Sequence, residues 1–229
     1  MITSLNTEDL IEYTDRQLSA FYPDGSSIPR DRKTFESFKT SLDRVEECFR
    51  HITLRGYSEK GAAVFSHLHS DQYSQYLYFL ANQLWHDEID ENVSRKLIGL
   101  NRALAGVFIS YKLDLPPHFL LGHPLGTILG NATYGDCLVV YQGVTINSGK
   151  DGTGEYVPKI GKGCFFGTGS SVIGCEPIGD RVSVGVDAVV YNQSIANDML
   201  VINKSGKQKV VPRSKPECFA QQFFDIELI

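Results

Sequence analysis

The sequence predicts an α+β protein in which an all-helical N-terminal domain is followed by a left-handed parallel β-helix of hexapeptide repeats. Up to about residue 115 the apolar residues recur at spacings of three and four, which is the period of a helix. After Pro117 they recur every six residues, and glycine repeatedly follows the apolar position. Such a fixed period indicates repeats that bury their apolar faces by stacking on one another.

The strongest helix of the first half is expected to start near Asp31. Its apolar face has helical spacing, in the series Phe35, Phe38, Leu42, Val45, Phe49 and Ile52. A second helix is expected to be capped by Ser70 or Asp71. Together with the two helices described next, these form a predicted domain over residues 1–115 that serves packing and oligomerisation.

Two further helices complete this predicted domain. Residues 91–111 have the pattern of a helix stopped by Pro116-Pro117, because proline lacks the amide hydrogen that a helix needs. A weaker helix over residues 7–21 is expected to end at the turn sequence of residues 23–25.

The second half, residues 116–205, keeps its six-residue register through ten positions. The apolar series runs Ile128, Tyr134, Val140 and Ile146, and resumes as Ile160, Phe166, Val172, Ile178, Val184 and Val190. We expect each to point to the axis of a coil with flat sides. Glycine follows at Gly135, Gly161, Gly167, Gly179 and Gly185, where a corner needs backbone conformations that a Cβ would penalise.

Composition narrows the possible functions. The net charge of −5 gives no electrostatic basis for binding nucleic acid or an anionic membrane. We expect no signal peptide, because the first residues lack a basic segment followed by an apolar one, and no apolar run is long enough to span a bilayer. Five cysteines without a CxxC spacing favour reduced thiols in the cytoplasm. His67 and His69 lack a third ligand at suitable spacing, so no metal is expected.

Two unusual elements interrupt the repeats. A glycine-rich loop of residues 147–159 separates the two parts of the apolar series, and loops on repeat scaffolds often carry function. His123 lies between glycine and proline at the start of the repeats. Histidine is the side chain that exchanges protons near neutral pH, so a base for acyl transfer to a hydroxyl is the favoured interpretation.

Several of these residues resemble serine O-acetyltransferases. The resemblance covers roughly residues 110–205 and extends more loosely over the helical half. It lies in four motifs, Gly122-His123-Pro124-Leu125-Gly126-Thr127-Ile128-Leu129-Gly130, Tyr141-Gln142-Gly143-Val144-Thr145, Pro158-Lys159-Ile160-Gly161 and Gly167-Thr168-Gly169-Ser170, together with the loop. It implies acetyl transfer from acetyl-CoA to the hydroxyl of serine or a similar small acceptor, as a step of cysteine biosynthesis.

The resemblance also implies roles for particular residues. His123 matches the catalytic base, and Asp114 is the nearest match to the aspartate that orients it, although a turn residue before Pro116 is an equal interpretation. Asp71 matches a residue that reaches the amino group of the substrate, with a helix cap as the alternative. Acetyl-CoA would lie between subunits of a trimer or a dimer of trimers, and the matching residues here are Gly143, Gly167, Thr168, Gly169, Ser170, Gly185 and Lys204.

The chain departs from the family pattern at the acceptor site. Gly122 stands where the family has aspartate, and Tyr156 and Val157 replace the arginine and histidine that close the loop. An arginine that binds a carboxylate contributes about 1.5–3 kcal/mol per charged hydrogen bond, so its loss weakens serine as the acceptor. A sugar or surface-polysaccharide hydroxyl is therefore an alternative acceptor, and a non-catalytic oligomeric scaffold is a third interpretation.

The C-terminal tail, residues 206–229, is acidic and ends in Ile229. In the resembled family such a tail inserts into the next enzyme of cysteine synthesis, so cysteine synthase is a possible partner. Phe223 and Phe224 suit the other interpretation, a segment packed on its own assembly, and this one is slightly favoured.

Overall fold

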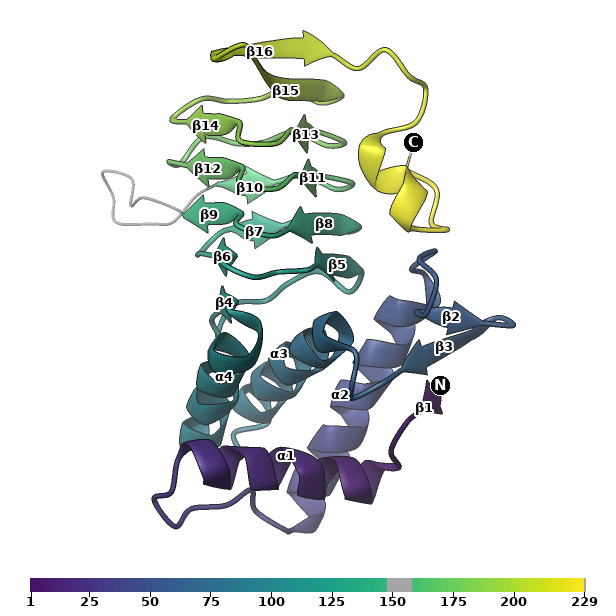
Figure 1. Cartoon of the computed structure of the whole chain (residues 1–229), viewed down its shortest axis with the longest axis vertical. Helices are drawn as coiled ribbons and strands as arrows, with labels where there is room; N and C mark the ends of the chain where they lie inside the picture. Colours follow the sequence, from purple (N-terminus) through teal and green to yellow (C-terminus); the bar gives the residue numbers. More distant parts are fainter. Residues whose placement is uncertain (148–157, 229) are drawn as a thin grey trace. The chain divides into compact units, whose positions relative to one another are not determined.

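A computed structural model describes residues 1–147 and 158–228 (Figure 1). The chain divides into two compact units. The first comprises Met1–Arg50 and Arg55–Lys112, and the second His51–Leu54 and Leu113–Ile229. Within the described ranges, no helix is both long and apolar enough to cross a bilayer.

The helices of the first unit are α1 (Thr7–Phe21), α2 (Arg32–Arg50), α3 (Ser70–His86) and α4 (Glu91–Ala105). Short polar side chains begin three of them. Asn6 Oδ1 accepts from the Asp9 amide at 2.8 Å, Asp31 Oδ1 from Thr34 at 2.8 Å, and Asp90 Oδ1 from Asn92 at 2.8 Å. The helix predicted near Asp31 and the one predicted over residues 7–21 are confirmed.

Two predicted helix ends are wrong. The residue before α3 is His69, whose Nδ1 lies 3.5 Å from the Gln72 amide, and Ser70 and Asp71 lie inside the first turn. Helix α4 ends at Ala105, well before Pro116. Gly106 adopts a left-handed φ of 66° and donates its amide to Arg102 O at 3.0 Å, which ends the helix.

A small sheet accompanies these helices, so the first unit is not wholly helical. Strand β1 (Ile2–Thr3) pairs parallel with β3 (Ala62–Phe65), which pairs antiparallel with β2 (Ser58–Glu59). Strand β4 (Phe108–Ile109) follows α4. The strands are too short to show a period in the sequence. Large aromatic side chains fill the core, among them Phe38, Phe49, Phe65, Tyr76 and Phe79.

The second unit is a parallel β-helix in which each coil contributes a strand or a bridge to each side (Figure 1). One side contains β5 (Phe119–Gly122), β8 (Leu138–Tyr141), β11 (Phe165–Phe166), β13 (Ser183–Val184) and β15 (Met199–Lys204), and β16 (Lys207–Pro212) pairs antiparallel with β15. The next side contains β6 (Ile128–Leu129), β9 (Thr145–Asn147), β12 (Ser171–Ile173) and β14 (Val189–Tyr191). The remaining side contains β7 (Thr133–Tyr134) and β10 (Lys159–Ile160), continued by bridges through Ile178 and Ile195.

Aliphatic and aromatic side chains stack along the axis in one row per side. The rows are Leu121, Val140, Phe166, Val184 and Val201, then Leu129, Ile146, Val172 and Val190, and then Tyr134, Ile160, Ile178 and Ile195, all of them buried. Nine of the ten predicted axial positions are therefore confirmed. Ile128 is the exception, because it is 42% exposed and pairs with outward-facing Thr145, while Leu129 takes the axial place.

Glycine is required where consecutive coils approach most closely. Gly135, Gly161 and Gly179 follow one another up a single corner. A Cβ on Gly161 would lie 2.5 Å from the carbonyl carbon of Gly179 and 2.5 Å from Asp180 Oδ1, distances that real Cβ atoms do not show. Stacking of the coils therefore depends on the absence of side chains at this corner.

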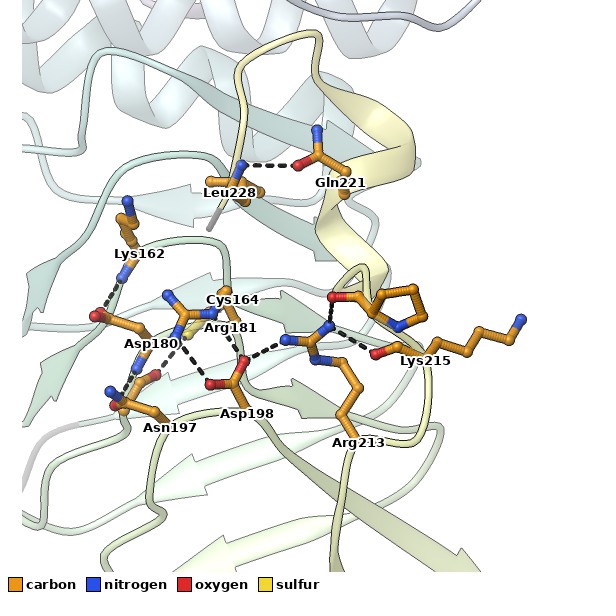
Figure 2. Close-up of polar contacts among 12 residues, drawn as sticks. Lys162, Cys164, Asp180, Arg181, Asn197, Asp198, Arg213, Lys215, Gln221 and Leu228 are labelled. Carbon is orange, nitrogen blue, oxygen red and sulfur yellow. Dashed lines mark hydrogen bonds and ion pairs between the residues drawn. The ribbon is translucent and has the colours of Figure 1, made fainter.

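The tail folds back onto the first side of its own β-helix. Its 3₁₀ helix η1 (Phe219–Phe223) packs on β11, with the Phe223 ring stacked on Phe165 at 6.0 Å and the Phe219 ring 4.4 Å from Phe165. The Gln221 side chain accepts from the Leu228 amide at 2.8 Å (Figure 2). It also donates to Phe224 O at 3.0 Å. The favoured prediction, a tail packed on its own protein, is confirmed as far as Leu228. Ile229 lies outside the described residues.

Charged residues bind the start of the tail to the last coils of the β-helix. Asp198 accepts from Arg181 through two hydrogen bonds of 2.8 Å and also from Arg213 (Figure 2). Arg213 in turn donates to the carbonyl groups of Lys215 and Pro216. The hydrogen bonds from Arg181, followed by those from Arg213, hold the pKa of Asp198 well below its ordinary value.

Substituting Gly161 by alanine should destabilise the β-helix by about 1–3 kcal/mol, the usual cost of overpacking, because the added methyl group meets backbone of the next coil. Chemical denaturation would measure the loss. Gly122→Ala is the matched control, since the three atoms nearest to its added methyl group belong to the Tyr141 ring, at 3.2–3.3 Å, and not to the backbone of another coil. Equal stability of wild type and Gly161→Ala would contradict the close approach of the coils.

Asp198→Asn should lower the free energy of unfolding at pH 7 by about 1–2 kcal/mol, because charged hydrogen bonds are lost from a carboxylate that is 38% exposed. Since the folded-state pKa is depressed, this contribution is present above the unfolded-state pKa and disappears as pH falls below about 4. The difference between wild type and variant should therefore shrink between pH 5 and pH 2. Asp187→Asn, at another left-handed aspartate, is the control. A difference that does not depend on pH would refute the ionic origin.

Candidate active site

His123 occupies the first corner of the β-helix, directly after β5. Its side chain is exposed, and its φ of 49° is unusual for a residue other than glycine. Its carbonyl accepts from the Leu125 amide at 2.7 Å, while Thr127 donates its amide to Pro124 O at 3.0 Å. The Thr127 hydroxyl is buried and donates to Tyr141 O at 2.9 Å. The turn therefore presents an imidazole to solvent from a firmly bonded backbone.

Gly122, immediately before this histidine, lies under the ring of Tyr141. The strand register pairs Gly122 with Tyr141, and a Cβ at Gly122 would meet the ring at 3.2 Å. The aspartate that the resembled family has at this position would therefore clash with Tyr141 in its present place. The absence of a side chain at Gly122 therefore agrees with the position of the Tyr141 ring above it.

Residues equivalent to His123 in the following coils are Gln142, Thr168 and Val186, by the same register. We call these four the edge column. Gly167 and Gly185, which precede Thr168 and Val186, pack closely on the next coil, at 3.2 Å and 3.1 Å for an added Cβ. The Gln142 side-chain oxygen is buried and accepts no hydrogen bond from the described residues. The edge column is therefore a row of four residues in which His123 lies at one end and the side-chain oxygen of Gln142 lies one coil further on.

The predicted glycines along this corner do not offer free amide groups. Gly143 donates to Leu125 O at 2.9 Å, Gly169 to Gln142 O at 2.9 Å, Gly167 to Val184 O at 2.8 Å and Gly185 to Val201 O at 2.8 Å. Free amide groups at such an edge would be donors for an oxyanion. These four amides are committed to coil stacking, so the glycines contribute shape and any such donor comes from another group.

The remaining predicted cofactor residues differ in exposure. Ser170 is fully buried and its amide donates to Gly167 O at 3.0 Å, and its part in cofactor binding stays a prediction. Thr168 is partly exposed. Lys204 is exposed at the end of β15, opposite Lys207 in the hairpin, and β15 runs parallel to β13 past the corner that carries Val186. Lys204 and Lys207 therefore place two positive charges at the tip of the hairpin, one coil beyond Val186 of the edge column.

The predicted acceptor residues are dispersed or outside the described residues. Asp114 is exposed in the segment that leads into β5, and its action on His123 stays a prediction. Asp71 belongs to the first unit, where it is 6% exposed and accepts from Ser70 Oγ at 3.3 Å. Tyr156 and Val157 lie outside the described residues.

An aspartate–histidine pair that sequence reasoning missed lies at the base of the β-helix. His118 Nδ1 is 2.9 Å from Asp136 Oδ2, and the His118 amide donates to Asp136 Oδ1 at 3.0 Å. Burial raises the pKa of Asp136, but the hydrogen bonds from His118 outweigh it, so the pKa is lower than usual. The two residues are 18 positions apart, which is three hexapeptides and one residue fewer than the register that pairs Phe119 with Leu138. That spacing was the available signal.

Comparison with known proteins agrees with the resemblance. No protein-family model matches the chain. Serine acetyltransferase of Synechococcus elongatus is 30% identical over 116 residues, which are 50% of this chain and 47% of that protein. The chain thus spans about half the length of this curated relative.

Solved structures extend the likeness to the fold of nearly the whole chain. Serine acetyltransferase of Neisseria gonorrhoeae gives a TM-score of 0.65 at 23% identity, covering 95% of this chain and 85% of that one. The enzyme of Brucella abortus in complex with coenzyme A gives 0.60 at 16% identity, covering 91% and 93%. The chain is thus similar to serine acetyltransferases in sequence over half of its length and in fold over most of it, and the predicted helical region followed by a left-handed parallel β-helix is confirmed.

Proposed function

We propose that this chain transfers an acetyl group from acetyl-CoA to the hydroxyl of L-serine or a close analogue, with His123 as the general base. The observation that carries the proposal is the exposed imidazole of His123 at the head of the edge column, on a turn whose sequence resembles that of serine acetyltransferases. The similarity in sequence and the coenzyme A complex of a neighbour in fold support acetyl-CoA as the donor.

In the proposed reaction the neutral imidazole of His123 accepts the proton of the acceptor hydroxyl. The hydroxyl oxygen forms a bond to the thioester carbonyl carbon, and the carbonyl oxygen carries the negative charge of the tetrahedral intermediate. Collapse breaks the carbon–sulfur bond and expels the thiolate of CoA, which takes the proton from the imidazolium. The products are the O-acetyl ester and CoA, and His123 is neutral again.

Donor binding is proposed along the edge column. Gln142, Thr168 and Val186 follow His123 from coil to coil, so an extended molecule with its thioester at His123 would contact one of them per coil. The exposed lysines at the hairpin, Lys204 and Lys207, suit the phosphate groups of CoA at the far end of such a molecule.

A sugar hydroxyl remains the second candidate acceptor, and the packing at Gly122 favours it. Tyr141 fills the space above Gly122, so no carboxylate at this position faces an amino-acid substrate. The choice between the two acceptors decides the specificity but does not change the role of His123.

A homotrimer or a dimer of trimers is proposed as the assembly, because the outer face of the β6–β14 side is apolar. Ile128, Val189 and Tyr191 are 42%, 47% and 66% exposed there, and Val186 and Leu125 lie on the adjoining corner. Burial of such side chains between copies would remove apolar surface from water.

Five cysteines without a disulfide suit the reducing cytoplasm. Cysteine synthase binding through Ile229 stays a prediction.

Replacing His123 with alanine should lower acetyl transfer by about 10²–10⁴-fold, the usual contribution of a general base. Release of the CoA thiol would be followed with L-serine, homoserine and a panel of sugars, for wild type, His123→Ala and the control His86→Ala, which lies at the end of α3. Unchanged transfer to serine by His123→Ala would sink the mechanism. Absence of thiol release from wild type with every acceptor would favour a non-catalytic scaffold.

The assembly is tested by the double substitution Val189→Lys and Tyr191→Lys. Light scattering should give wild type a mass of three or six times the chain mass of 25.5 kDa, and the variant a mass near that of one chain, because buried charges oppose association. Leu68→Lys is the control, at an apolar residue that is 78% exposed in the first unit. An unchanged mass for the double variant would exclude this face as the interface.

A further inference from the structure

The ring of Tyr141 lies over the residue that precedes His123. The strand register pairs Tyr141 with Gly122, and three atoms of the ring lie 3.2–3.3 Å from the place of a Cβ on Gly122. The Tyr141 carbonyl accepts a hydrogen bond of 2.9 Å from the hydroxyl of Thr127, at the other end of the same turn. The backbone of Tyr141 is therefore bound to the turn that carries His123. An acceptor that approaches the imidazole across Gly122 meets the Tyr141 ring.

Two phenylalanines contact this ring. The Phe165 centroid lies 5.6 Å from that of Tyr141, and the Phe223 centroid lies 6.1 Å from it, with the two planes at 62°. Phe223 is also stacked on Phe165, at 6.0 Å and 11°. Aromatic rings attract one another at such separations and angles. Because Phe223 belongs to η1, which packs on β8, the tail contributes a contact to a ring beside the candidate base (Figure 1).

Hydrogen bonds fix the backbone on both sides of Phe223. The Thr53 amide donates to Phe223 O at 3.0 Å, and the Thr53 hydroxyl donates to Gln222 O at 2.8 Å. Directly after Phe223, Phe224 forms an antiparallel bridge with Ile52. The segment that contains Ile52 and Thr53 belongs to the same unit as the β-helix. Phe223 therefore cannot shift along the β-helix without breaking these bonds.

A plainer interpretation is that the tail only covers apolar surface of the β-helix. It accounts for Phe219, whose ring lies 4.4 Å from Phe165 and which remains 51% exposed. Phe223 differs, because it is 7% exposed, contacts Tyr141 and has its carbonyl bound by Thr53. Of the two rings of η1, the one that is buried and firmly held is thus the one that contacts Tyr141.

We propose that the Tyr141 ring is the wall that limits the size of the acceptor at His123, and that Phe223 is a positioning residue that holds this wall in place. The inference rests on the proposed acetyl transfer by His123, and it adds the element that selects among hydroxyl acceptors. A ring without packing partners turns about its side-chain bonds, whereas a ring packed against Phe165 and Phe223 keeps one rotamer. The tail thereby belongs to the acceptor site.

The test compares a larger with a smaller acceptor. Homoserine and L-serine differ by one methylene, and glucose and xylose differ by a hydroxymethyl group. Release of the CoA thiol gives kcat/KM for each, and the ratio of the larger to the smaller acceptor is the selectivity, taken for whichever pair the wild type acetylates. Tyr141→Ala should raise this ratio by about 10–200-fold, the usual discrimination of a pocket against one methylene. Tyr141→Phe keeps the ring and should leave the ratio unchanged.

The tail is tested by Phe223→Ala. This variant should raise the same ratio by a smaller factor, because the Tyr141 ring is loosened but not removed. Phe223→Leu refills the space and should restore most of the wild-type ratio, and the KM for acetyl-CoA should stay the same in every variant. Phe219→Ala is the matched control, since it removes a ring of the same 3₁₀ helix that lies against Phe165. It should lower both activities together, as any general loss of stability would, without changing their ratio.

The outcomes separate this inference from the proposed function. Thiol release by wild type, with a ratio that is unchanged in Tyr141→Ala, overturns the wall and leaves the proposed acetyl transfer intact. A ratio that changes in Tyr141→Ala but not in Phe223→Ala overturns the role of the tail. Absence of thiol release from wild type with all four acceptors refutes the proposed function itself, and the inference with it.

Discussion

The close stacking of one coil on the next is the constraint on which the second unit depends. Backbone approaches backbone so nearly at the corner of Gly135, Gly161 and Gly179 that no side chain fits between them. That approach brings the axial rows into contact and lets the amides of one coil bond to the carbonyls of the next. The hydrophobic core and the hydrogen bonding therefore rest on the same geometric requirement.

The same constraint shapes the candidate site. Stacking places His123, Gln142, Thr168 and Val186 in one line, one residue per coil, and makes a strip long enough for an extended ligand. It also commits the amides of Gly143, Gly167, Gly169 and Gly185 to carbonyl groups of neighbouring coils, so these four amides are not available to a ligand. Catalytic capacity then depends on the few positions where the edge carries a reactive group, and His123 is the residue at the head of that edge.

The tail adds a layer that the repeats do not require. Phe219 and Phe223 cover Phe165 on the outer face of the β-helix, and Arg213 ties the start of the tail to Asp198 in the last coils. Beyond η1, Asp225 reaches His51, which lies beside His118. The tail thereby connects the last coils with the first.

Much of the fold follows from local sequence. Helix α1 was predicted with its observed bounds, and the six-residue period identified nine of ten axial positions, because these features depend on neighbours within a few residues. Errors occurred where local alternatives are close in energy. Gly106 ends α4 earlier than Pro116 would, and Leu129 replaces Ile128 because both of these adjacent residues suit the axis.

The sequence by itself thus determined the repeat, its glycine corners and the histidine on the first turn. Only the tertiary structure placed Tyr141 over Gly122, committed the corner amides to stacking, and paired His118 with Asp136 and His51 with Asp225. The physical reason is range. Periodicity records contacts between residues that are close along the chain, whereas a site made from separate coils and a returning segment depends on how the chain closes on itself.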